Sequence, residues 1–229
     1  MADPNRALFE SVVRLLAPVL DELVFVGGCT TGLFITDPAA GGIRPTRDVD
    51  AIVDVTSYAK YTALAERLRA LGLGEDTTPG APLCRWRHGQ LIVDVMPTDA
   101  TVLGFSNRWY PAAIETAQTF HIAGHDVRVV TPALFIATKL EAFRGRGGDD
   151  VVASHDLEDI IAVVDGRPEI VGDVAAASDD VRAYVGAEIR TLLDNRDFTE
   201  ALAGFLLPDP ASQARRSLLE DRLRSLSIP

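Results

Sequence analysis

The stretch RPTRDVDAIVDV, from Arg44 to Val55, combines the pattern of a buried strand with two carboxylates at its start. Asp48 and Asp50 stand two residues apart, and side chains at positions i and i+2 of a strand share one face. At about 3.3 Å of rise per residue, their Cα atoms lie roughly 6–7 Å apart, so the two charges repel unless a positive group lies between them. The stretch therefore predicts a strand that presents a pair of acids to a cation.

The composition predicts a globular protein with a proper core. Hydrophobic residues make up 47 % and charged residues 24 % of the 229 residues, which suits one large domain or a domain with a helical appendage. No long apolar run and no basic N-terminal region occurs, so we expect neither a membrane span nor a secretory signal. Cys29 and Cys84 lack metal-like spacing, so we expect two reduced thiols in a cytoplasmic protein.

The net charge of −11 argues against a broad basic surface that grips a nucleic-acid duplex. A polyanionic substrate must then be held by a local patch or by bound cations. Six arginines near the acids in sequence are candidates for a local anion-binding rim, although scattered solvated arginines fit equally well: Arg44, Arg47, Arg85, Arg87, Arg144 and Arg146.

Hydrophobic periodicity and turn residues predict a mixed α/β part over residues 1–130 and a helical part over residues 131–229. The loop TDPAAGGIRPT separates the first strand from the strand with the acids. Two apolar runs, LCRWRH and LIVDVMP, flank Gly89-Gln90 and predict a hairpin with a two-residue turn. Further elements are expected as helices at 5–20 and 58–73, strands at 22–28, 117–123 and 125–130, and helices around 131–143, 156–165, 180–193, 198–205 and 211–226.

A third acid, Asp94, interrupts the run LIVDVMP. Taken alone, a single acid in a strand is as readily a solvent-facing residue as a ligand. Together with Asp48 and Asp50 on a neighbouring strand, it predicts a cluster that binds Mg²⁺, because this ion is held by carboxylates and substrate phosphates. The pair Gly27-Gly28, which ends a strand, can offer backbone N–H groups to those phosphates.

The Gly-Gly turn, the Asp-x-Asp on the following strand and the third Asp on a later strand resemble the nucleotidyltransferase superfamily typified by DNA polymerase β. The segments VGGCTTGLF, RPTRDVDAIVD, LIVDVMPTD, VVTPALFIATKLEAFRGR and HDLEDI are similar to the AbiEii and MenT-type nucleotidyltransferases of type IV toxin–antitoxin systems. The resemblance runs from about Val24 to Ile160. It implies an α+β fold, with a polymerase β-like core of mixed sheet and flanking helices followed by a helical C-terminal part.

The resemblance also implies roles for individual residues. Asp48, Asp50 and Asp94 correspond to the metal ligands, with two Mg²⁺ ions expected and Mn²⁺ as an alternative. The residues implied to bind the nucleotide are Gly27, Gly28, Thr30, Arg47 and Lys139. The residues implied to be catalytic are these three aspartates, Lys139 and Asp156.

Two of these roles have competing interpretations. Lys139 also fits an ordinary helix lysine paired with a neighbour such as Glu141. Asp156 stands in the first turn of its helix, where an acid stabilises the helix dipole. The insertion GRGGDDVVAS leaves Asp149 and Asp150 as alternatives to Asp156.

The implied function is transfer of a nucleoside monophosphate from an NTP to an acceptor hydroxyl. The resemblance indicates a tRNA 3′ end as acceptor and a toxin with a cognate antitoxin protein. A small-molecule transferase of the aminoglycoside-modifying type is the alternative, since cationic acceptors suit an acidic protein. A catalytically inactive nucleotide-binding module is the remaining alternative.

Overall fold

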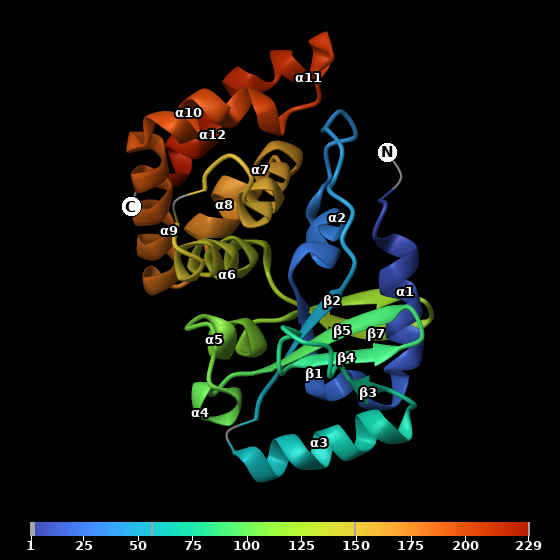
Figure 1. The fold of residues 1–229 in the computed structure, drawn as a ribbon. Helices are drawn as coiled ribbons and strands as arrows, with labels where there is room; N and C mark the ends of the chain where they lie inside the picture. Colours follow the sequence, from blue (N-terminus) through green and yellow to red (C-terminus); the bar gives the residue numbers. More distant parts are fainter. Residues whose placement is uncertain (1–2, 56, 149, 229) are drawn as a thin grey trace. The chain divides into compact units, whose positions relative to one another are not determined.

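The computed structural model of the chain describes residues 3–55, 57–148 and 150–228, which fall into two compact units. The sheet unit comprises Pro4–Thr30 and Pro45–Thr131, and the helical unit comprises Asp3, Thr31–Arg44 and the described chain from Pro132 onward. Figure 1 shows the strands between blue and yellow-green and most helices of the helical unit from yellow to red.

The described residues of the sheet unit form a seven-stranded mixed sheet with the order β3-β4-β5-β2-β1-β7-β6 (Figure 1). β1 lies antiparallel to β2 and parallel to β7, whereas β2 lies parallel to β5. β4 with β5 and β6 with β7 form antiparallel hairpins. The strands are β1 (Leu23–Val26), β2 (Val49–Val53), β3 (Gly74–Glu75), β4 (Arg85–His88), β5 (Leu91–Pro97), β6 (Gln118–Ile122) and β7 (His125–Val129).

The centre of this sheet is apolar on both faces. All four residues of β1 are buried, and every residue of β2 except Asp50 is buried as well. Such continuous apolar runs are typical of strands that are covered from both sides. Asp50 is therefore an acid set into an otherwise apolar central strand.

Two longer helices flank the sheet. α1 (Arg6–Leu15) buries an apolar stripe that contacts β2, β5 and β7, and its Phe9 ring packs edge-on against Phe25 at 5.0 Å. α3 (Tyr58–Ala70) begins where the Ser57 side chain accepts a hydrogen bond from the Lys60 backbone N–H. The shorter helices of the unit are η1 (Ala17–Glu22), η2 (Gly28–Thr30), α4 (Ala100–Leu103) and α5 (Tyr110–Glu115).

The helical unit is organised around α6 (Pro132–Gly145), which is buried along most of its length and contacts α7, α8 and α9. Phe135 of α6 packs against Phe34 of α2 with ring centroids 5.1 Å apart. The other helices are α2 (Thr31–Phe34), α7 (His155–Gly166), α8 (Ile170–Ala175), α9 (Asp179–Asp194), α10 (Arg196–Ala201), η3 (Leu202–Phe205), α11 (Pro210–Ala214) and α12 (Arg216–Leu226).

The mixed sheet with flanking helices and a helical C-terminal part confirms the predicted α+β class. The helix expected over residues 5–20 ends at Leu15, and a 3-10 turn that contains Pro18 follows it, because proline has no N–H to continue an α-helix. Thr31–Arg44 lies within the predicted α/β part of residues 1–130, but in the structure it packs with the helical unit. No helix among the described residues combines the length and the apolarity that a bilayer span requires.

Candidate active site

The turn that follows β1 fixes the first part of the site. Gly27 has a positive φ of 74°, a conformation that glycine adopts without strain. Any side-chain carbon at Gly27 would collide with the Asp50 carboxylate, so the backbone of the turn lies directly against this acid. The buried Thr30 hydroxyl donates to the Gly27 carbonyl at 2.8 Å and holds the turn closed. The turn at Gly27 and the Asp50 carboxylate are therefore packed directly against each other.

The three predicted metal ligands lie together in the sheet unit. Asp50 of β2 and Asp94 of β5 are direct partners in the parallel register, and Asp48 immediately precedes β2. The Asp48 and Asp94 side chains are 30 % and 9 % exposed, so the cluster opens to solvent at Asp48. Thr46 donates its hydroxyl to Asp48 Oδ1 at 2.9 Å and fixes that side chain.

A positive group lies between two of these acids, and it is Arg85. Its Nε donates to Asp94 Oδ1 at 2.8 Å and its Nη2 to Asp94 Oδ2 at 2.7 Å, which is the two-pronged geometry favoured by arginine and carboxylate. The same Nη2 donates to Asp48 Oδ2 at 2.9 Å. Hydrogen bonding to Asp94, aided by both negative charges, raises the pKa of Arg85 above its ordinary value. The guanidinium is therefore charged at neutral pH.

The donor set fits Mg²⁺ chemically, because three carboxylates are ligands that this ion prefers. As they stand, however, no three His, Cys, Asp or Glu side chains among the described residues are arranged to hold a metal ion. Asp48 and Asp94 share one guanidinium, so one of their two negative charges is left without a partner in this contact. Burial raises the pKa of the neighbouring Cys84 thiol to about 12, so this thiol is neutral at neutral pH.

The other two predicted catalytic residues lie in the helical unit, where they bind each other. Lys139 of α6 donates to Asp156 Oδ1 at 3.1 Å and to Asp159 Oδ2 at 2.7 Å, both on α7. Its side chain is 10 % exposed, and those of the two aspartates are 4 % and 1 % exposed. Arg44 reaches Asp159 at 3.1 Å, and Arg146 pairs with Asp156. Lys139 therefore pairs with acids 17 and 20 residues away rather than with Glu141.

The remaining predicted residues have separate positions. Arg47 is exposed and forms no ion pair with any described residue. Asp150 accepts hydrogen bonds from the backbone N–H groups of Val152 and Ala153 and so caps a turn. Asp149 lies outside the described residues.

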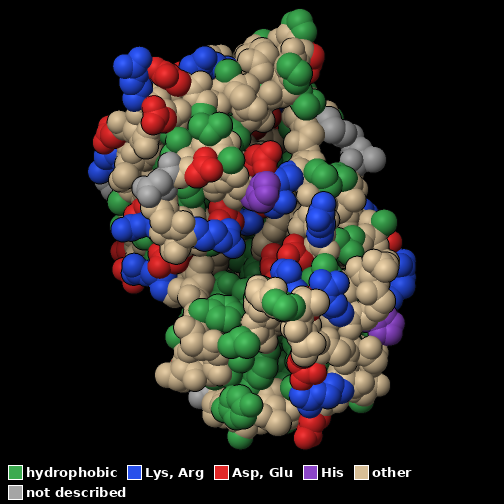
Figure 2. Space-filling view, viewed as in Figure 1, with side chains coloured by type: hydrophobic (Ala, Val, Ile, Leu, Met, Phe, Trp, Pro, Cys, Tyr) green, Lys and Arg blue, Asp and Glu red, His purple; other side chains and the backbone are tan. Residues whose placement is uncertain are grey.

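The proposed arginine rim is divided among individual acids. Arg87 donates to Asp76 at 2.6 Å, and Arg144 donates to Glu188 at 2.6 Å. On the face shown in Figure 2, Lys and Arg side chains are interspersed with Asp and Glu side chains. This pattern favours local recognition of an anion over a continuous basic surface.

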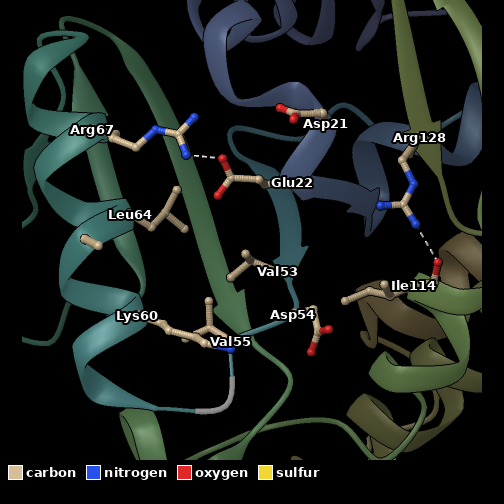
Figure 3. Close-up of a pocket in the computed structure, with 11 residues that line it drawn as sticks. Asp21, Glu22, Val53, Asp54, Val55, Lys60, Leu64, Arg67, Ile114 and Arg128 are labelled. Carbon is tan, nitrogen blue, oxygen red and sulfur yellow. Dashed lines mark hydrogen bonds and ion pairs between the residues drawn. The ribbon is translucent and has the colours of Figure 1, made fainter.

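A separate pocket of about 440 Å³ lies at the other end of β2, where α3 begins (Figure 3). Apolar side chains such as Val53, Val55 and Leu64 line it, together with acids and bases in equal number. Figure 3 shows Arg67 directed at Glu22, with which it forms an ion pair. None of the residues predicted for catalysis or nucleotide binding lines this pocket.

Sequence reasoning missed the pairing of Arg85 and the part played by Asp159. The signal for Arg85 was present, because a two-residue turn at Gly89-Gln90 places His88 opposite Leu91 and hence Arg85 opposite Asp94. The Arg44–Asp159 contact joins residues 115 positions apart, and no local pattern encodes it.

No model of a known protein family matches the sequence, and no curated protein matches it either. Among solved structures, an antigenic nucleotidyltransferase-like protein from Paracoccidioides brasiliensis is similar, with a TM-score of 0.52 and 21 % sequence identity. The match covers 85 % of this chain and 92 % of that one. The chain thus has a nucleotidyltransferase-like fold, as the sequence motifs predict.

Proposed function

We propose that this protein is a Mg²⁺-dependent nucleotidyltransferase that moves a nucleoside monophosphate from an NTP to an acceptor hydroxyl. The observation that carries the proposal is the register of the sheet, which brings Asp48, Asp50 and Asp94 together beside the turn at Gly27. The nucleotidyltransferase-like fold supports the same chemistry.

The chain's own residues would divide the work as follows. Asp48, Asp50 and Asp94 would hold the metal, with two ions as the expected number and Mn²⁺ as an alternative. Mg²⁺, when bound, neutralises charge that develops on the transferring phosphoryl group. Gly27 and Gly28 would let the triphosphate approach the backbone, since neither residue has a side chain in its way. Asp94 would accept a hydrogen bond from the attacking hydroxyl and orient it.

Thr30, Arg47, Lys139 and Asp156 belong to the proposal on the strength of sequence resemblance. In this structure the Thr30 hydroxyl donates to the Gly27 carbonyl and Lys139 donates to Asp156 and Asp159, so a phosphate would compete with these partners. Arg47 is exposed and can reach an anion without breaking an ion pair with any described residue.

The acceptor that the sequence motifs favour is a tRNA 3′ end, which would make the protein the toxin of a toxin–antitoxin pair with a cognate antitoxin. A small-molecule acceptor is the second candidate, and one observation favours it. The chain carries a net charge of −11, which attracts a cationic acceptor and repels a polyanionic one.

A labelling experiment tests the proposal. Purified protein is incubated with Mg²⁺, total tRNA and each α-labelled NTP in turn, beside the variants Asp48→Ala and Asp50→Ala. Asp54→Ala is the matched control, since Asp54 is an exposed acid at the opposite end of β2. We expect label on tRNA with one NTP, a loss of about 10²–10³-fold or more in both site variants, and normal transfer in the control.

The other outcomes separate the alternatives. Label on an aminoglycoside but not on tRNA would reassign the acceptor and leave the chemistry standing. Full transfer by Asp50→Ala would refute the site. NTP binding with no transfer to any hydroxyl acceptor would indicate the inactive nucleotide-binding module.

A further inference from the structure

Arg85 belongs to the same row of the sheet as the acids that it contacts. Arg85 is the direct register partner of Asp94 across β4 and β5, and Asp94 is the direct partner of Asp50 across β5 and β2. Residues directly opposite one another on neighbouring strands point to the same face. The sheet thus places a permanent positive charge beside the carboxylates that the proposed function assigns to the metal.

The two contacts of Arg85 differ in strength. Asp94 accepts two hydrogen bonds from the guanidinium, and its side chain is 9 % exposed. Asp48 accepts one, from a nitrogen that also serves Asp94, and its side chain is 30 % exposed. A hydrated cation arriving from solvent therefore meets the weaker, more open contact first.

A divalent cation and the guanidinium cannot share Asp48 without repulsion. Thr46 and Arg85 together already engage both oxygens of Asp48. A cation bound between Asp48 and Asp50 would lie within a few ångströms of the Arg85 charge, where like charges repel strongly in a partly buried site. The contact that yields is the single one to Asp48, because the fork on Asp94 is bidentate and more buried.

We propose that Arg85 is a resident counter-cation of the carboxylate site, which competes with the divalent metal for Asp48 and keeps Asp94 in place when the metal enters. This inference rests on the proposed function only in taking the three aspartates as metal ligands. The affinity for the metal then depends on the ion pair between Arg85 and Asp48 as well as on the three aspartates.

The test is a direct titration with Mn²⁺, with free ion followed by electron paramagnetic resonance and no nucleotide present. A single charge within 4–6 Å shifts an ionic equilibrium by about 10–1000-fold. We therefore expect Arg85→Met to bind Mn²⁺ at least about tenfold more tightly than the native protein. Arg85→Lys keeps the charge but not the fork, so its affinity is expected to lie closer to the native value than that of Arg85→Met. Arg87→Met is the matched control, since Arg87 lies on the same strand and pairs with Asp76 instead.

The outcomes distinguish this inference from the proposed function. If Arg85→Met binds Mn²⁺ no more tightly than the native protein while Asp50→Asn loses Mn²⁺ binding, the competition is refuted. The metal site itself would stand. No Mn²⁺ binding above the Asp50→Asn background in any protein would overturn the site and the competition together. If Arg85→Met does not fold, Arg85→Gln replaces it with the same expectation, because glutamine retains a donor for Asp94 without the charge.

Discussion

The sheet unit and the helical unit each carry a cluster of aspartates and cations. The two clusters differ in the burial of the aspartates and in the number of cations that contact them. In the sheet unit, Asp48 and Asp94 share the single guanidinium of Arg85, and the cluster opens to solvent at Asp48. In the helical unit, Lys139, Arg44 and Arg146 surround Asp156 and Asp159, and both acids are almost fully buried.

The difference separates two acids that share one guanidinium from two acids that have three cations around them. A buried acid must be paired and hydrogen-bonded, because an unpaired buried charge is strongly destabilising. In the helical cluster, side chains of the protein itself meet this requirement, so the cluster connects α6 to α7. In the sheet cluster Asp48 and Asp94 share one guanidinium, an arrangement that suits the cation proposed for this site.

The largest effect is expected from Lys139→Met. Removing the lysine leaves Asp156 and Asp159 with only the more exposed Arg146 and Arg44 as partners, and breaking a buried pair costs up to about 3–5 kcal/mol of unfolding free energy. Urea unfolding followed by far-UV circular dichroism measures it. The only other lysine, Lys60, has an exposed side chain, so Lys60→Met is expected to stay within about 0.5 kcal/mol of the native protein. Native stability in Lys139→Met, with NTP binding lost, would show that Lys139 serves the nucleotide instead.

A smaller effect is expected from Gly27→Ala, compared with Gly104→Ala. Both glycines have positive φ, at 74° and 83°, so each alanine carries backbone strain of about 1–2 kcal/mol. Only at Gly27 does the added carbon also collide with Asp50, since the space around Gly104 is open. We expect Gly27→Ala to be the less stable variant and to bind Mn²⁺ more weakly, as urea unfolding and titration would measure. Equal stability and equal Mn²⁺ affinity of the two variants would show that the turn at Gly27 does not influence Asp50.

Alkaline pH probes the sheet unit through Tyr61. Burial raises the pKa of Tyr61 from 10.0 to about 12. Its contribution to stability is therefore fully present below pH 10 and is lost as the pH rises through 12. Cys84, whose pKa is raised in the same direction from 9.0, adds to this loss.

Tyr61→Phe should remove part of this dependence on pH. The variant also loses the hydrogen bond to the Val95 carbonyl, at about 0.5–1.5 kcal/mol below pH 9. Both tryptophans, Trp86 and Trp109, lie in the sheet unit, so their fluorescence follows its unfolding. A slope between pH 10 and pH 12 that is unchanged in Tyr61→Phe would contradict the assignment.

The smallest effect on stability is expected from Asp48→Asn. Arg85 keeps its two bonds to Asp94 in this variant, and a partly exposed ion pair contributes about 0–1 kcal/mol. Thermal unfolding should therefore be nearly native while nucleotidyl transfer is lost. If Asp48→Asn were destabilised as much as Lys139→Met, the two clusters would not differ in their contribution to stability.

Local patterns in the sequence predicted the parts of this structure that local physics determines. The hairpin at Gly89-Gln90, the helix from Tyr58 and the acids at the start of β2 follow from turn chemistry and periodicity. The two-stranded pair that includes β3 (Gly74–Glu75) and the short helix α8 (Ile170–Ala175) were not predicted, because they are too short to show a period.

The contacts that the sequence did not predict are long-range ones. Thr31–Arg44 reads as a continuation of the N-terminal part, yet it packs with helices a hundred residues further along the chain. Lys139 pairs with Asp156 and Asp159 rather than with Glu141, because the packing of α6 on α7 sets its partners. Pairings of this kind depend on tertiary contacts that a single sequence does not display.

The two-residue turn between β4 and β5 places an unusual constraint on insertions and deletions. Surface turns ordinarily tolerate changes in length. Here Gly89 and Gln90 fix the register that brings Arg85 opposite Asp94. A change in turn length that shifts this register by one residue would turn the arginine to the opposite face of the sheet. A change at a solvent-exposed tip could thus alter the charge beside the carboxylates without replacing any residue that touches them.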